Sequence, residues 1–223
     1  ALARMAALVE PLPARDEARA AVLPAGDGLW RIELACRDRP GLLSSITAAL
    51  GVAGLDVLDA SIAGWPDGGV ADAFTVRSET APEPEGLVVQ LRAARRQPPR
   101  ALPLPDAVVT FDDQASPWHT LCKVVAPDRP GLLHALAVAF ATSGADVHSA
   151  RITTSGRMAE DHFELADGRG EKLGEEVEAA IGVAVRAGAS TRARTKLARN
   201  RNNRVTNAKQ PPRTVGSEDL ANS

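Results

Sequence analysis

The residues with the clearest capacity for chemistry form a six-residue segment, Asp-Arg-Pro-Gly-Leu-Leu, which occurs twice. It spans residues 38–43 and again 128–133, an offset of 90 residues. A proline in the first turn of a helix costs no hydrogen bond, so each segment is predicted to begin a helix. The glycine lets a ligand approach the backbone, and the amides of a helix start attract a carboxylate. Since the aspartate can take an ammonium group, the segment predicts a binding site for an amino acid.

A plainer alternative is that the aspartate and proline only start a helix and that the arginine is solvated. Duplication of the segment favours ligand binding in at least one repeat, and the sequence does not select which one. The candidate ligand-binding residues are Asp38, Arg39, Pro40, Gly41, Leu42, Asp128, Arg129, Pro130, Gly131 and Leu132. Asp56 and Asp146, each two residues after a glycine, are secondary candidates for the pocket, with simple turn residues as the alternative interpretation.

The repeat extends beyond this segment and defines secondary structure. In the first copy the apolar spacing predicts, in chain order, a strand at 29–36, a helix at 42–50, a strand with Leu58, Ala60 and Ile62 on one face, a strand at 70–76, a helix at 82–96 and a short strand at 108–111. In the second copy it predicts strands at 118–126, 146–154 and 158–166, and helices at 130–143 and 171–187. One residue is missing from the turn before Phe163, relative to Phe74, as expected for a loop deletion.

The order β-α-β-β-α-β predicts the α+β fold class, with two tandem ferredoxin-like domains, each a four-stranded antiparallel sheet with both helices on one face. After Gly188 no fourth strand follows in the second copy. Three explanations are open: a three-stranded second sheet, a segment 106–112 shared between the copies, or an edge supplied by a partner chain. Because a bare sheet edge invites pairing, we favour association of the two sheets or a homodimer.

Four regions are predicted along the chain: 1–28 as an upstream linker or the end of a preceding domain, 29–112 and 116–188 as the two domains, and 189–223 as a disordered tail. Residues 189–213 carry eight Lys or Arg and no acid, so the rest of this 223-residue chain of net charge −2 is acidic. Such a basic segment lacks the apolar surface needed to fold alone. Most charge runs of this kind are solvated, although acidic partners or nucleic acid remain an alternative.

Several other features have structural interpretations. Cys36 and Cys122 are expected to be small buried hydrophobes, because they lie in predicted strands at non-equivalent repeat positions. The four histidines are spaced by 15, 14 and 14 residues, which predicts no metal site. Asp72 and Asp161 share a strand face with Phe74 and Phe163, so each needs water at the sheet end or a base such as Arg151. With neither a signal peptide nor a bilayer-length apolar stretch, the expected location is cytoplasmic.

A ferredoxin-like repeat with this segment between its first strand and first helix resembles the ACT domain, a regulatory module that binds amino acids. The resemblance covers roughly residues 29–188. More narrowly, the segments 109–113, 116–118, 124–133, 150–154 and 161–163 are similar to the carboxy-terminal ACT pair of bacterial [protein-PII] uridylyltransferase/uridylyl-removing enzymes. That family implies glutamine as the ligand and control of a fused domain that modifies the PII protein.

The chain departs from that family in lacking its catalytic motifs. Neither a carboxylate cluster for Mg²⁺ nor a His-Asp dipeptide is present, so we predict no catalytic residue, metal or cofactor here. A freestanding ACT-repeat regulator is the stronger rival. An RNA-binding module is the weaker one, because a ferredoxin-like reader of RNA needs aromatic residues on its central strands and the chain has four Phe, three Trp and no Tyr.

Overall fold

The structure is a computed structural model that describes residues 7–65, 67–96 and 100–189, all within one compact unit. The basic segment from residue 190 onward, for which the sequence predicts disorder, lies outside the described residues. None of the helices in the described ranges is long and apolar enough to cross a membrane.

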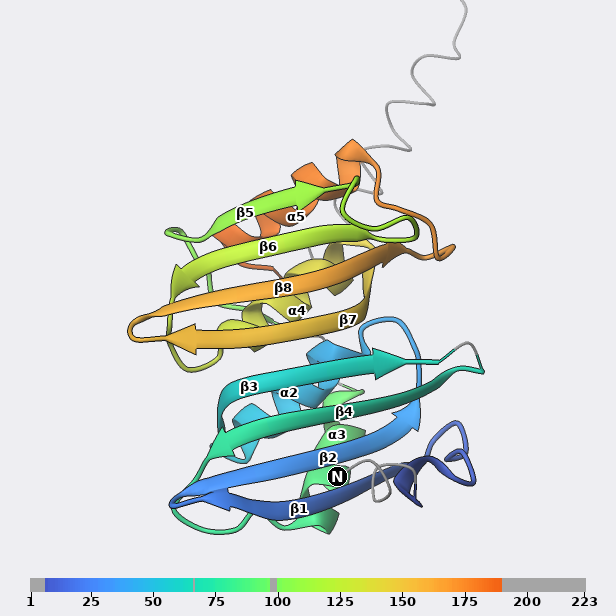
Figure 1. The fold of residues 1–223 in the computed structure, drawn as a ribbon, viewed down its shortest axis with the longest axis vertical. Helices are drawn as coiled ribbons and strands as arrows, with labels where there is room; N and C mark the ends of the chain where they lie inside the picture. Colours follow the sequence, from blue (N-terminus) through green and yellow to red (C-terminus); the bar gives the residue numbers. More distant parts are fainter. Residues whose placement is uncertain (1–6, 66, 97–99, 190–223) are drawn as a thin grey trace, which may run out of the picture. The chain divides into compact units, whose positions relative to one another are not determined.

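Eight strands and four labelled helices follow each other along the described chain (Figure 1). The elements of the first repeat are β1 Ala18–Gly26, β2 Leu29–Arg37, α2 Leu42–Val52, β3 Asp56–Gly64, β4 Gly69–Arg77 and α3 Pro84–Ala94. Those of the second are β5 Val108–Asp112, β6 Thr120–Pro127, α4 Leu132–Ser143, β7 Ala145–Ser155, β8 Met158–Asp167 and α5 Glu175–Ala187. Every strand and helix predicted from the sequence is present, with ends shifted by a few residues.

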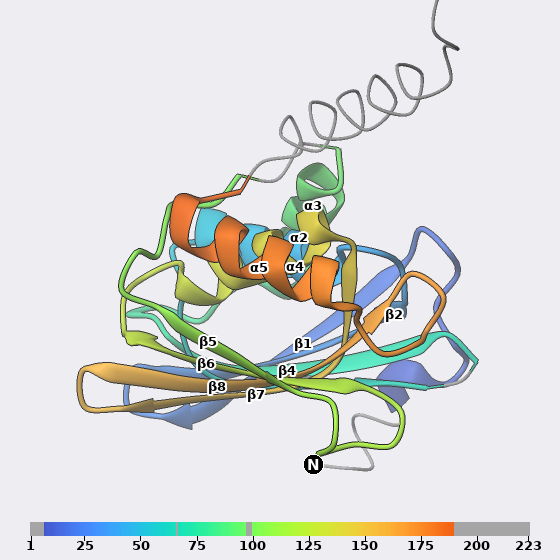
Figure 2. The same cartoon turned by 90° about the horizontal axis from the view of Figure 1, so that it is seen from above.

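All eight strands form one antiparallel sheet in the order β1-β2-β4-β3-β7-β8-β6-β5. The four helices cover one face of this sheet, as Figure 2 shows. The α+β class with an antiparallel sheet, predicted from the element order, is therefore confirmed. Each half of the sheet presents its strands in the same order, outward from β3 and from β7.

The fourth strand of each half differs from the prediction. The segment at 108–112 is a strand, but it pairs with β6 of the second repeat and not with the first repeat, so the predicted assignment was wrong. In the first repeat this edge position beside β2 is taken by β1, from the region expected to be an upstream linker. Both pairings join strands that follow each other in the chain, and a short loop closes at a lower entropy cost than a long one. The second sheet is thus four-stranded without a shared segment or a partner chain.

The two halves meet edge to edge through β3 and β7, which confirms the predicted association of the two sheets. Ala60 lies opposite Ile152, and Ile62 lies opposite Ala150. These pairs exchange under the 90-residue offset of the repeat, so the junction has a pseudo-twofold relation centred on Ser61 and Arg151. The central edges are covered in this way, and β1 and β5 are the outer edges.

Leu58 departs from the predicted alternation. A β-bulge lies between Val57 and Asp59, and the equivalent bulge in β7 lies between Val147 and Ser149. As a result Val57, and not Leu58, packs beside Ala60 against the core. An inserted residue shifts the side-chain alternation by one, which is the physical reason for the error.

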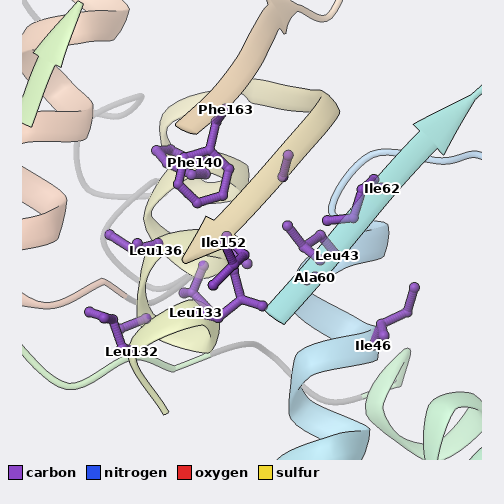
Figure 3. Close-up of a cluster of buried hydrophobic side chains, with 14 of the residues drawn as sticks. Leu43, Ile46, Ala60, Ile62, Leu132, Leu133, Leu136, Phe140, Ile152 and Phe163 are labelled. Carbon is purple, nitrogen blue, oxygen red and sulfur yellow. The ribbon is translucent and has the colours of Figure 1, made fainter. Parts of the chain in front are cut away.

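The hydrophobic core is continuous across the β3 and β7 junction. Figure 3 shows Leu43 of α2 and Ala60 of β3 on the side of Ile152 of β7, while Phe140 and Phe163 pack in the second repeat. Cys36 and Cys122 are buried free thiols, as the sequence predicts. The core therefore joins the two repeats into one packed layer between sheet and helices.

Gly188, which ends α5, is predicted to be a position where an added methyl group is costly. Its φ is +79°, and a Cβ there would lie 2.9 Å from the Ala101 backbone oxygen. We expect Gly188→Ala to lower the free energy of unfolding by roughly 2 kcal/mol or more in urea titrations. The control is Gly182→Ala inside α5, where the Cβ would meet only the Arg186 guanidinium at 3.4 Å. That change should be neutral or stabilising by up to about 1 kcal/mol. If both variants lost the same unfolding free energy, the backbone conformation of Gly188 would not be the cause.

Candidate functional site

The two Asp-Arg-Pro-Gly segments form type II turns that lead into helices. The Leu42 amide donates to the Arg39 carbonyl at 3.1 Å, and the Leu132 amide donates to the Arg129 carbonyl at 3.1 Å. The glycines have φ values of +71° and +80°, as the third residue of such a turn requires. The prolines therefore precede the helices instead of lying in their first turns, which corrects the prediction. The turn itself requires glycine at these positions. Any other residue there would strain the backbone, so a loss of ligand binding in such a variant would not identify the binding site.

Both helix starts lack a side-chain cap. Gly41 and Gly131 are the N-cap residues of α2 and α4, and no acidic residue lies in either first turn. The partial positive charge of each helix start is therefore not offset by the helix itself. Such a start can accept a carboxylate when a cavity adjoins it.

A pocket adjoins each turn, and its opposite wall comes from the other repeat. The first pocket brings Asp38, Arg39 and Gly41 together with Asp146 and Val147. The second brings Asp128, Arg129 and Gly131 together with Asp56 and Val57. The primary and secondary candidates from the sequence are thus combined crosswise between the repeats. Leu42 and Leu132 also line the pockets, whereas Pro40 and Pro130 are not among the lining residues.

The two pockets differ in size. The second has a cavity volume of about 340 Å³, and the first has about 30 Å³. Pockets that bind small molecules typically measure ~300–1,000 Å³, while a single water needs at least ~10–15 Å³. The second pocket can hold a small ligand, and the first has room for about two waters.

A buried carboxylate lines each pocket, and the sequence analysis did not include either one among the site residues. Asp72 lines the first pocket and Asp161 the second, and both are 1% exposed. Burial raises the pKa of Asp72 to about 8, and the nearby Asp38 charge adds to this. Burial also raises the pKa of Asp161 to about 6, against a hydrogen bond from the Thr153 amide at 3.3 Å. Neither carboxylate pairs with Arg151 or lies in water at the sheet end, contrary to expectation. The sequence signal for these two residues was that they share a strand face with Phe74 and Phe163, which indicates burial.

Two residues of the second pocket contact the connecting segment, the part of the chain at 100–107 that leads from the first repeat into β5. Arg129 Nη2 donates to the Pro103 carbonyl at 2.5 Å, and His134 Nε2 lies 3.1 Å from the Arg100 carbonyl. His134 Nδ1 lies 3.0 Å from Thr47 Oγ1 on α2. Burial lowers the pKa of His134, while its backbone contacts with Arg100 and Ser44 oppose this shift. Residues of this pocket therefore contact both the facing helix and the connecting segment.

The histidines of the second repeat show what sequence spacing misses. The rings of His119 and His148 stack with centroids 4.2 Å apart, although 29 positions separate them. Burial, and then the neighbouring His148, lower the pKa of His119, while Glu164 opposes this shift. No group of three or more potential metal ligands gathers within the described ranges.

Comparison with known proteins agrees with this architecture. Residues 120–182 match the ACT domain family, so the second repeat is an ACT domain. The chain is similar to the bifunctional uridylyltransferase/uridylyl-removing enzyme of Rhodospirillum rubrum, with 35% identity over 74% of this chain and 19% of that protein. Proteins of the same name from Gluconobacter oxydans and Vibrio cholerae are 34% and 33% identical over 66% and 64% of the chain, and 18% of each protein.

The chain spans about a fifth of the length of these curated relatives. The ACT match at residues 120–182 and the similarity to these enzymes agree with the resemblance seen in the sequence. A solved structure of an unknown protein from Galdieria sulphuraria aligns with 74% of this chain and 91% of its own, at 17% identity and a TM-score of 0.25.

Proposed function

We propose that this chain is the amino-acid-sensing ACT pair of a nucleotidyltransferase that modifies the PII protein, with glutamine as the ligand. The observation that carries the proposal is the cavity of about 340 Å³ beside the uncapped start of α4, lined by Asp128 and Asp161. A helix start and carboxylates on one small cavity complement the two charges of a free amino acid. The two ACT units comprise residues 18–94 and 108–187. They are tandem copies of one ferredoxin-like unit, and in each copy the first strand along the chain, β1 or β5, is the outer edge strand.

Glutamine is supported by the polarity of the cavity as well as by the resemblance to uridylyltransferases. Three aspartates, Asp56, Asp128 and Asp161, line the pocket. Like charges repel, so this lining opposes a ligand with an acidic side chain. Hydroxyl groups of Thr47 and Thr154 also line it and can hydrogen-bond a carboxamide. The chemistry therefore favours a neutral, polar amino acid over its acidic counterpart.

Binding can be transmitted through the contacts of Arg129 and His134. A ligand carboxylate beside the α4 start competes for Arg129, which otherwise donates to the Pro103 carbonyl of the connecting segment. That segment also donates from the Ala101 and Leu104 amides to the end of α5, at Ala189 and Val185. Occupancy of the pocket thus alters the packing between repeats. Coupling of this kind is typically worth ~1–3 kcal/mol, enough to bias a neighbouring catalytic domain.

Isothermal titration calorimetry of the purified chain tests ligand binding. We expect saturable heat with glutamine, and at least tenfold weaker binding of glutamate, because of the acidic lining. Serine, glycine and the branched-chain amino acids complete the series. If none of them binds, the repeats have only a packing role and the sensor proposal fails.

The rival functions lead to different observations. A freestanding regulator has the same pockets and no catalytic domain, so the gene sequence upstream of Ala1 distinguishes it; the much greater length of the relatives favours fusion. RNA binding is disfavoured by the placement of aromatics: Phe74 and Phe163 are fully buried on the helix side, and Trp30 donates its Nε1–H to the Ser78 carbonyl. Homodimerisation stays a prediction, testable by analytical ultracentrifugation.

A further inference from the structure

We infer that only the second of the two pseudo-equivalent pockets binds the amino acid, one molecule per chain, and that the first pocket is closed by its own side chains. This inference rests on the proposed amino-acid binding. It also assigns the binding to one repeat, which the sequence alone left open. It follows from differences between the two pockets at matching positions of the repeat.

The first difference is at the C-terminal end of the facing helix. Gly51 of α2 lines the second pocket, and the matching residue of the first pocket is Ala141 of α4. The Ala141 methyl lies 3.5 Å from the point where a Cβ on Gly41 would be, in van der Waals contact with that turn. A Cβ on Gly131 or on Gly51 would have no atom within 4 Å, apart from those of its chain neighbours and its own helix. A methyl group therefore approaches the first turn, and the second turn is open.

The neighbouring position adds to this difference. Leu50 of the second pocket is matched by Phe140 in the first, and the Phe140 ring is fully buried. A larger ring and an additional methyl group occupy the volume that is empty in the second pocket. Gly41 is accordingly half-buried, whereas Gly131 is exposed.

The carboxylates differ as well. Asp72 Oδ1 is sealed from solvent and has no hydrogen-bond partner among the described residues. Asp161 Oδ1 accepts the Thr153 amide, and Asp161 lies on the wall of the large cavity, where a ligand ammonium can approach it. A zwitterion with its carboxylate at the α4 start then has Asp128 and Asp161 available for its ammonium group. The first pocket keeps the same types of residue without space for the ligand.

Matched substitutions in the two turns test the assignment by calorimetry with glutamine. Asp128→Asn should weaken binding at least tenfold, because an ammonium loses a charged partner. Asp38→Asn is the control at the equivalent position and should leave the dissociation constant within about twofold. Both side chains are exposed and asparagine keeps the acceptor oxygen, so neither change should impair folding.

A steric variant provides a second measurement. Gly51→Leu places a side chain on α2 where a Cβ meets no neighbour, so it should reduce affinity at least tenfold while the melting temperature does not fall. A stoichiometry of two per chain, or equal weakening by Asp38→Asn and Asp128→Asn, would overturn the single-pocket assignment. Lack of binding by the unmodified chain would instead overturn the proposed function, so the two failures are distinguishable.

Discussion

Asp72→Asn is expected to raise the free energy of unfolding by about 1–3 kcal/mol at pH 8 and to change it far less at pH 5. Asp72 is 1% exposed, and burial raises its pKa from 3.8 to about 8. Because the folded-state pKa lies above the unfolded one, the folded chain keeps a proton that the unfolded chain releases. Stability from this group is complete below about pH 4 and is lost as the pH rises towards 8. Asparagine carries no charge to bury, so it removes this loss.

Urea titrations of both proteins at pH 5 and pH 8 measure the effect. Asp59→Asn is the control, since Asp59 is an exposed carboxylate on the neighbouring strand β3. Asp161→Asn should give a smaller gain, which grows between about pH 4 and pH 6 and is constant above that, because the Thr153 amide hydrogen-bonds that carboxylate and its pKa is about 6. An Asp72→Asn variant that is less stable than its parent at pH 8 would show that the buried charge has a compensating partner.

The element types were predictable because apolar periodicity is a local property. The helix at Pro84–Ala94 buries Leu87 and Leu91, which are four positions apart, and the strand at Thr120–Pro127 buries alternate residues, so both spacings are visible in the sequence. The strand Ala18–Gly26 was missed because it is alanine-rich and contains Pro24. An edge strand tolerates both, since one side of it makes no ladder hydrogen bonds. The Asp27-Gly28 pair before Leu29 was the available hairpin signal.

The candidate site was predictable in part for a similar reason. The repeated turn identifies itself by residue type, and the structure brings Asp56 and Asp146 to the walls facing these turns. Asp161 was not selected, because its role depends on a cavity formed by two repeats. The difference between Gly51 and Ala141 has meaning only once α2 and α4 face each other. Such information resides in tertiary packing and not in local sequence.

Phe163→Ala is expected to lower the free energy of unfolding by about 3–5 kcal/mol. The Phe163 side chain is fully buried, and its ring packs edge-on against Phe140 with centroids 4.8 Å apart. Alanine removes this contact and leaves a cavity that the surrounding β-sheet cannot fill without distortion. Phe111→Ala, at a partly buried position on the edge strand β5, is the control and should cost less than half as much.

The consequence extends to the first repeat, because the core is shared across β3 and β7. Trp30 reports on the first repeat when Trp65 and Trp118, which are 44% and 74% exposed, are replaced by phenylalanine. In that background Phe163→Ala should lower the unfolding midpoint monitored by Trp30 fluorescence as much as the midpoint monitored by circular dichroism. A Trp30 midpoint that stays at the parent value would mean that the repeats unfold independently. Coincident shifts would instead show that both repeats unfold as one cooperative unit, so that a ligand held between them stabilises the whole of it.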